Sequence, residues 1–196
     1  MGWPSHLSYQ QVVATGIRRS LRILASYGDL DGATALLTAD PSLADDPAAL
    51  AAAAEGGHDA IVRLILRHRP RAAERVAVVA RHAEVTELLF QSGMNPNLPG
   101  WLGVTPLHRF AREGHVTKAA VFLDHGADLH ARDEEFRTTP LGYAAMSGRV
   151  RMVAFLLRRG AQLTPPGRPA WATPLALATS RTHNRIVRVL KAYEAR

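Results

Sequence analysis

The segment TPLHRFAREGHVTKAAVFLDHGA, from Thr105 to Ala127, carries the pattern that decides the fold. Thr105 suits the N-cap of a helix, because its side-chain oxygen can accept a hydrogen bond from a free amide of the first turn. Pro106 follows at the first helical position, where the missing N–H has no cost. Gly114 suits the left-handed position that closes a helix. The pattern therefore predicts a short helix that begins after Thr105 and ends at Gly114.

A second helix is predicted directly after the first one, with apolar side chains at helical spacing and Gly126 at its end. Its apolar positions are Val116, Ala119, Ala120 and Leu123. Two short antiparallel helices cannot bury their apolar faces alone, so such a unit needs neighbours of the same kind. We therefore interpret the segment as one unit of a repeat array.

The same pattern returns at a nearly constant spacing. Thr139-Pro140-Leu141 lies 34 residues after Thr105-Pro106-Leu107, and Thr173-Pro174-Leu175 lies 34 residues after that. Gly148 and Gly160 stand where Gly114 and Gly126 stand in the earlier unit. With a period close to 33 residues, Thr-Pro-Leu-His, Gly-His and Gly-Ala-Asp together resemble the ankyrin repeat family. The resemblance covers Leu21 to Leu190 and implies an all-α, ankyrin-type helical repeat solenoid, with short β-hairpin fingers in its C-terminal half.

The repeats divide the chain into three parts of one expected domain, 1–196, of about six repeats. Residues 1–20 are an N-terminal lead and capping helix, with the helix running from about Tyr9 to Ala25. Residues 21–96 form three compact repeats, of which the third, about Ala72 to Met94, is the most degraded but leaves room for two helices. Residues 97–196 form three longer repeats with a C-terminal cap. Their extra length is expected to form fingers at Asn97–Val104, His130–Thr138 and Leu163–Ala172, which are rich in Pro, Gly and polar residues.

Composition indicates a globular protein, with 47% hydrophobic and 21% charged residues among 196. The absence of cysteine fits a reducing compartment, and neither a secretory signal nor a membrane-spanning segment is recognisable. We expect a cytoplasmic monomer without membrane association. Only two of the 24 basic residues are lysines, a skew that looks like coding bias. The resemblance suggests a bacterial ankyrin repeat domain-containing protein.

Motifs for catalysis are missing from the sequence, so no enzymatic activity, catalytic residue, cofactor or metal is expected. There is no nucleophile elbow, phosphate-binding loop, dinucleotide fingerprint or His-Glu-x-x-His. His58, His82, His108, His115 and His183 fall in slots that resemble the family's structural histidines, which hydrogen-bond within or between repeats. One alternative remains open, a zinc site at His125, Asp128 and His130, which lie close in sequence.

The resemblance implies a non-catalytic protein-protein interaction module, or scaffold, that binds a protein partner through the concave face and the finger loops. All three fingers contain an aromatic residue, and exposed aromatic residues with arginine nearby are typical of binding hot spots. Tyr27 and Glu55 are the corresponding helix-end positions of the first two repeats. In the last three repeats the predicted partner-binding residues are Trp101, Leu102, Val104, Arg112, Glu113, Glu135, Phe136, Thr138, Met146, Ser147, Pro169, Ala170, Trp171, Ser180 and Arg181.

A second functional hypothesis is polyanion or nucleic-acid binding by the arginine-rich C-terminal half. Residues 1–98 carry a net charge of −1, whereas residues 99–196 carry +8. The arginines fall on second helices as well as on fingers, and charge on both faces is typical of a solvated surface. A protein partner is therefore the leading hypothesis, and binding that weakens steeply with salt would favour the alternative.

Overall fold

The computed structural model describes residues 21–164 and 169–195, and it divides the chain into two compact units with the boundary between Asn95 and Pro96. The predictions for residues 1–20, including most of the helix expected from Tyr9 to Ala25, lie outside the described residues. Residues 165–168 of the last predicted finger also lie outside them.

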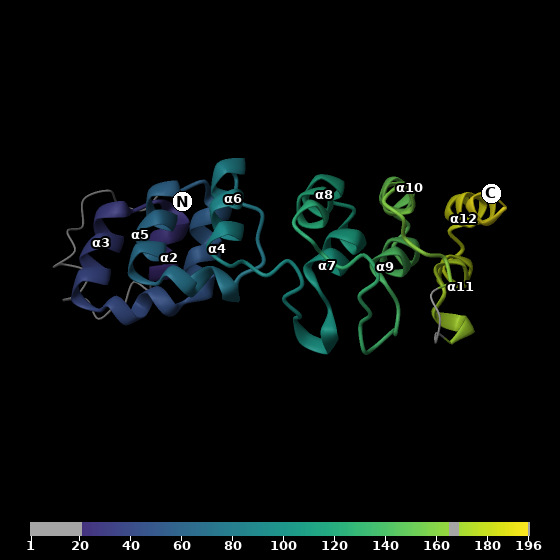
Figure 1. Ribbon diagram of the computed structural model, residues 1–196, viewed down its shortest axis with the longest axis horizontal. Helices are drawn as coiled ribbons and strands as arrows, with labels where there is room; N and C mark the ends of the chain where they lie inside the picture. The colour runs from purple at the N-terminus through teal and green to yellow at the C-terminus, as the bar shows by residue number, and fades with distance from the viewer. Residues whose placement is uncertain (1–20, 165–168, 196) are drawn as a thin grey trace, which may run out of the picture. The chain divides into compact units, whose positions relative to one another are not determined.

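The first unit consists of short helices and 3-10 turns with tight connections between them (Figure 1). Its α-helices are α2 (Leu21–Tyr27), α3 (Leu30–Ala39), α4 (Pro47–Gly56), α5 (Asp59–His68) and α6 (Ala83–Gln91), and its 3-10 turns are η1 (Pro41–Asp45) and η2 (Pro70–Arg75). Aspartates begin three of these elements, because a short carboxylate can accept the free amides of a first turn. Asp29 accepts from the amide of Gly32 at 2.9 Å, and Asp46 accepts from that of Ala48 at 2.9 Å.

The third repeat differs from the prediction, because it has only one α-helix. Residues 76–82 are not helical, and the side chains of Val76, Val78 and Ala80 are buried in alternation, as in an extended chain. The segment is held from two sides. The amide of Arg81 donates to the carbonyl of Ala54 at 2.8 Å, and that of Ala80 donates to the hydroxyl of Thr86 at 2.9 Å. The expected first helix is therefore absent, and α6 stands alone.

The second unit consists of three helix pairs, and the first pair begins and ends as the sequence predicts. Its helices are α7 (Pro106–Glu113), α8 (Val116–Asp124), α9 (Pro140–Met146), α10 (Val150–Arg158), α11 (Pro174–Ser180) and α12 (Asn184–Glu194), with 3-10 turns η3 (Trp101–Gly103) and η4 (Ala170–Ala172). Gly114 and Gly126 have φ values of 86° and 85°, the left-handed conformation expected at these helix ends. Buried side chains join the pairs, including Leu107, Phe122, Leu141, Leu156 and Ile186.

The predicted β-hairpin fingers are loops without β-strands in the described residues. Single backbone hydrogen bonds close them, such as Gly100 N–H to Val104 O at 2.9 Å and Asp133 N–H to Thr138 O at 3.2 Å. A strand ladder does not form in the middle loop, because the Asp133 carboxylate accepts the amides of Phe136 and Thr138. The loops lie where the fingers were expected, but their conformation is set by turns and side chains.

Candidate partner-binding surface

Three loops of the second unit lie on one side of its helices, and we call the surface they form the loop face. It consists of the described residues of 97–104, 130–138 and 169–172. Figure 1 shows these loops projecting past α7, α9 and α11, on the side away from α8, α10 and α12. Hydrogen bonds join neighbouring loops, including Glu134 N–H to Leu102 O at 2.9 Å and the Thr138 hydroxyl to Ala172 O at 2.9 Å. The loop face is therefore a continuous, internally bonded surface.

The first loop presents the most exposed aromatic side chain among the described residues. Trp101 is 84% exposed and begins the turn η3. The turn is tight, since Leu102 has φ 55° and Gly103 has φ 70°. Val104 N–H donates to Trp101 O at 3.3 Å, while the next loop bonds to Leu102. The backbone below Trp101 is thus held on both sides, and its indole is left in solvent.

The second loop rests on a buried carboxylate. Asp133 is only 3% exposed, and it accepts the amides of Phe136 at 2.6 Å and Thr138 at 2.9 Å. Tyr143 of α9 lies beside it. Burial, together with the charge of Asp133 and a hydrogen bond to it, raises the pKa of Tyr143. The phenol therefore stays protonated and available as a donor to the carboxylate.

A buried histidine connects the first helix pair to the second loop. The amide and hydroxyl of Thr105 approach His108 Nδ1 at 3.2 and 2.8 Å, and His108 Nε2 lies 3.3 Å from Thr138 O. Since the Thr105 amide can only donate, Nδ1 accepts, and Nε2 carries the proton toward the carbonyl. Burial lowers the pKa of His108, which keeps the ring neutral. Thr105 thus caps α7 by pairing with His108, in a capping-box arrangement.

Most of the predicted partner-binding residues reach solvent. Eight are exposed, namely Trp101, Arg112, Glu113, Glu135, Ala170, Trp171, Ser180 and Arg181. Six are partly buried, namely Leu102, Val104, Phe136, Met146, Ser147 and Pro169. In the first unit Tyr27 and Glu55 are also exposed.

Thr138 is a correction to the predicted set, because its side chain is fully buried and cannot touch a partner. Its hydroxyl is bound to Ala172 O, so its role is to join two loops. Phe136 has a double role. Its ring packs edge-on against Tyr143, with centroids 6.0 Å apart, while part of it remains exposed.

Asp133 and Tyr143 support the surface but were not among the predicted residues. Asp133 stands three residues before Phe136, the spacing at which an aspartate can accept amides ahead of it in a turn. That signal was present in the sequence. Tyr143 carried none, because its contact with the loop depends on how α9 packs.

Four of the five structural histidines bond to groups in another element of the fold. His58 Nε2 lies 3.3 Å from Ser26 O, and His183 Nε2 lies 3.1 Å from Met146 O, each reaching the preceding repeat. His82 pairs with Asp59 at 2.7 Å, and His108 reaches Thr138. His115 instead lies 3.4 Å from its near neighbour Glu113.

The alternative zinc site is not assembled. His125 Nδ1 bonds to Val121 O at 2.8 Å in its own helix turn, and Asp128 accepts the amide of His130 at 2.8 Å. Across residues 21–164 and 169–195, no group of three or more His, Asp or Glu side chains is placed to hold a metal ion. The same described residues include no helix that is both long and apolar enough to cross a bilayer.

The fold and the loop face define a helical repeat protein with an exposed, loop-built surface. Residues 75–166 match the family model for ankyrin repeats (3 copies). This segment therefore consists of repeats of the ankyrin family. A search of curated proteins finds no match. Ankyrin repeats generally mediate protein-protein interaction.

Proposed function

We propose that this protein is a non-catalytic module that binds a protein partner through the loop face, with Trp101 as its principal contact. The observation that supports this most directly is the 84% exposure of Trp101 above a backbone fixed by hydrogen bonds. Covering a large exposed apolar side chain lowers the free energy of the complex, because apolar surface is removed from water. A loop that is already fixed loses little conformational entropy when the partner binds.

Exposed charged residues of the same unit would supply the polar rim that such a contact needs. Arg112 and Glu113 lie at the end of α7, and Glu135 lies on the neighbouring loop. Trp171, 54% exposed, offers a second aromatic contact on the third loop. Aromatic anchors surrounded by charged groups are typical of interfaces in which a few residues dominate affinity.

We also propose that the compact first repeats belong to the same family as the matched segment, in an array of about six repeats. The pairs α2/α3 and α4/α5 support this, since Gly28 and Gly57 have positive φ at the same turn as Gly114. In this proposal the chain is a cytoplasmic monomer, and the first unit has no binding loops of its own.

Affinity capture with mass spectrometry tests the proposal, using wild-type protein, Trp101→Ala and Leu30→Ala. Leu30 is an exposed apolar residue of α3, far from the loop face in sequence, and serves as the matched control. We expect Trp101→Ala to weaken capture of the wild-type partner by about 30-fold, as truncation of a binding hot spot does. Thermal stability should change by less than about 0.5 kcal/mol, because the side chain is in solvent.

Trp101→Ala is a cleaner test than a double variant that includes Phe136, because Phe136 packs on Tyr143 and its loss would also affect folding. If Trp101→Ala captures the same partner as wild type with undiminished yield, the loop face is not the binding surface and the proposal is wrong.

A further inference from the structure

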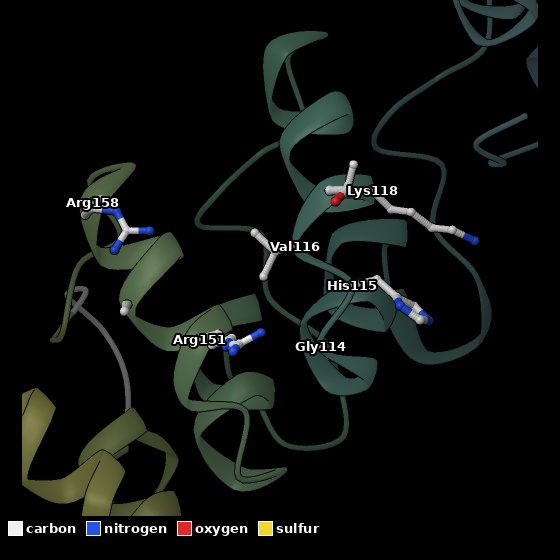
Figure 2. A pocket seen from close by; sticks show the side chains of 8 residues that line it. Gly114, His115, Val116, Lys118, Arg151 and Arg158 are labelled. Atoms are coloured by element: carbon white, nitrogen blue, oxygen red, sulfur yellow. The ribbon is translucent and has the colours of Figure 1, made fainter. Parts of the chain in front are cut away.

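A groove lies between α8 and α10, on the side of the second unit opposite the loop face. Its volume is about 700 Å³. Val116 and Ala154 provide apolar lining, and Lys118, Arg151 and Arg158 provide positive charge. Figure 2 shows Arg151 and Arg158 extending from α10 toward α8, with Val116 between the two helices. The guanidinium groups of α10 therefore line one edge of the groove.

These cations have no carboxylate to pair with in the described part of the chain. No aspartate or glutamate oxygen there lies within 4.0 Å of Arg151, Arg158 or Lys118. Arg159, one residue after Arg158, shows the opposite case, because it is paired with Asp124. The positive charges of the groove are thus not neutralised by carboxylates of the described residues, and they can pair with a partner.

The charge extends beyond the groove. From Phe136 to Tyr193 the sequence contains ten arginines and lysines and no aspartate or glutamate. Helix α12, which packs against α10, carries three of them, exposed at Arg185, Arg188 and Lys191. A surface with so strong an excess of one sign attracts ligands of the other sign and accelerates their association.

The lining favours an acidic polypeptide over nucleic acid. Single-stranded nucleic acids are held by stacking of bases on aromatic side chains, and no aromatic side chain lines the groove apart from the ring of His115. Guanidinium groups pair with carboxylates through two parallel hydrogen bonds, and Val116 and Ala154 suit an aliphatic side chain between them.

We propose that this groove is a second interaction surface, which binds an acidic segment of a protein partner with its carboxylates paired to Arg151 and Arg158. The proposal is independent of the loop face, because the two surfaces share no residue. A partner that reached both would gain affinity from the connection between its two contacts.

Fluorescence polarisation tests the proposal with a labelled peptide of repeated Glu-Glu-Ala. Two charge-reversal variants are compared, Arg151→Glu with Arg158→Glu, and Arg63→Glu with Arg67→Glu. The second pair is the matched control, since Arg63 and Arg67 are exposed on α5 of the first unit and change the net charge equally. We expect the groove variant to bind the peptide at least tenfold more weakly than wild type, and the control to bind less than threefold more weakly. A peptide of repeated Gln-Gln-Ala should not bind.

Three results would overturn the proposal. An equal loss in both variants would mean that only net charge matters. If the groove variant bound the peptide as tightly as wild type, the acidic peptide would bind at another site. Tighter binding of an oligothymidylate with the same number of negative charges, lost in the groove variant, would make the groove a phosphate-backbone site. Circular dichroism checks that each variant is folded, and Arg151→Gln with Arg158→Gln repeats the test if charge reversal unfolds the unit. Trp101→Ala should leave peptide affinity unchanged, so that this proposal and the loop-face proposal fail separately.

Discussion

The two units connect their helices with different chemistry, and the difference explains why only the second unit forms the loop face. In the first unit, exposed or half-buried aspartates such as Asp46 accept amides within two or three residues, and the chain turns without projecting. In the second unit the connections are long and depend on buried polar groups. Asp133 and His108 hold them by bonds to residues in the loop and across repeats. A projecting loop thus needs internal polar support that a tight turn does not.

This comparison implies that the second unit should be more sensitive to the loss of one polar side chain than the first. Removing an exposed cap costs about 1 kcal/mol, because water replaces the lost acceptor. Removing a buried acceptor leaves its donors without a partner, and the cost rises to several kcal/mol when the acceptor is charged.

Asp133→Asn should produce the largest effect. The carboxylate oxygens accept one amide each, from Phe136 and Thr138, and asparagine replaces one of these oxygens by an NH2 group, so that one backbone N–H would face another donor. We expect the second unit to lose about 2–4 kcal/mol of stability. Hydrogen exchange followed by mass spectrometry should show faster exchange across 130–164, with α4 and α5 unchanged.

Asp128→Asn is the matched control for this substitution. Asp128 lies in the same connection, but it is exposed and its carboxylate accepts only the amide of His130 among the described contacts. Its replacement should cost less than about 1 kcal/mol. Equal losses for the two variants would contradict the role that we assign to buried charge.

Thr86→Val should give a smaller effect, confined to the first unit. Thr86 is 3% exposed, and its hydroxyl accepts the amide of Ala80 in the non-helical segment 76–82. Valine has nearly the same shape but no acceptor, so we expect a loss of about 1–2 kcal/mol. Exchange at 76–82 should become faster.

Thr86→Ser separates the hydrogen bond from packing, because serine keeps the hydroxyl and removes a methyl group. It should destabilise the unit without accelerating exchange at Ala80. If serine and valine accelerate that exchange equally, Thr86 does not hold the segment by its hydroxyl.

The helices of the second unit could be predicted from the sequence because their signals are local. A Thr-Pro pair and a glycine with positive φ fix where a helix begins and ends, whatever lies beside it. The exposure of Trp101 could also be predicted from a local signal, because Trp101 lies in a segment rich in Pro and Gly, which is typical of a surface loop. The third repeat could not be predicted in this way. The run Val76 to Ala80 is apolar throughout and fits an extended segment as well as a helix.

The loop face was harder to predict where it depends on distant contacts. Thr138 resembles an exposed finger residue in the sequence, but its hydroxyl bonds to Ala172, 34 residues later. The same applies to Tyr143, whose contact with Asp133 arises from packing. The groove was missed for another reason. Its arginines lie on second helices, and the sequence alone does not show that Arg151 and Arg158 lack acidic neighbours.

His108 provides the last way to test the contrast between the units, through pH. Burial lowers its pKa in the folded state below the ordinary value of 6.5, which the unfolded chain retains. Well above pH 6.5 the ring is neutral in both states, and its contribution to stability is complete. As pH falls below that value, the unfolded chain binds the proton first, so stability declines toward the folded pKa. We expect the second unit to lose stability between about pH 7.5 and about pH 5.5, and His108→Gln to reduce that loss.

The measurement is chemical denaturation at both pH values, with hydrogen exchange to assign the change to the second unit. His115→Gln is the control, because His115 is exposed beside Glu113. This variant should still lose stability as pH falls, since His108 is unchanged in it. Protonation of His108 would place a hydrogen on Nδ1, toward the Thr105 amide that now donates to it. A pH response that survives in His108→Gln and disappears in His115→Gln would mean that the exposed histidine, and not the buried support of the loops, makes the second unit sensitive to acid.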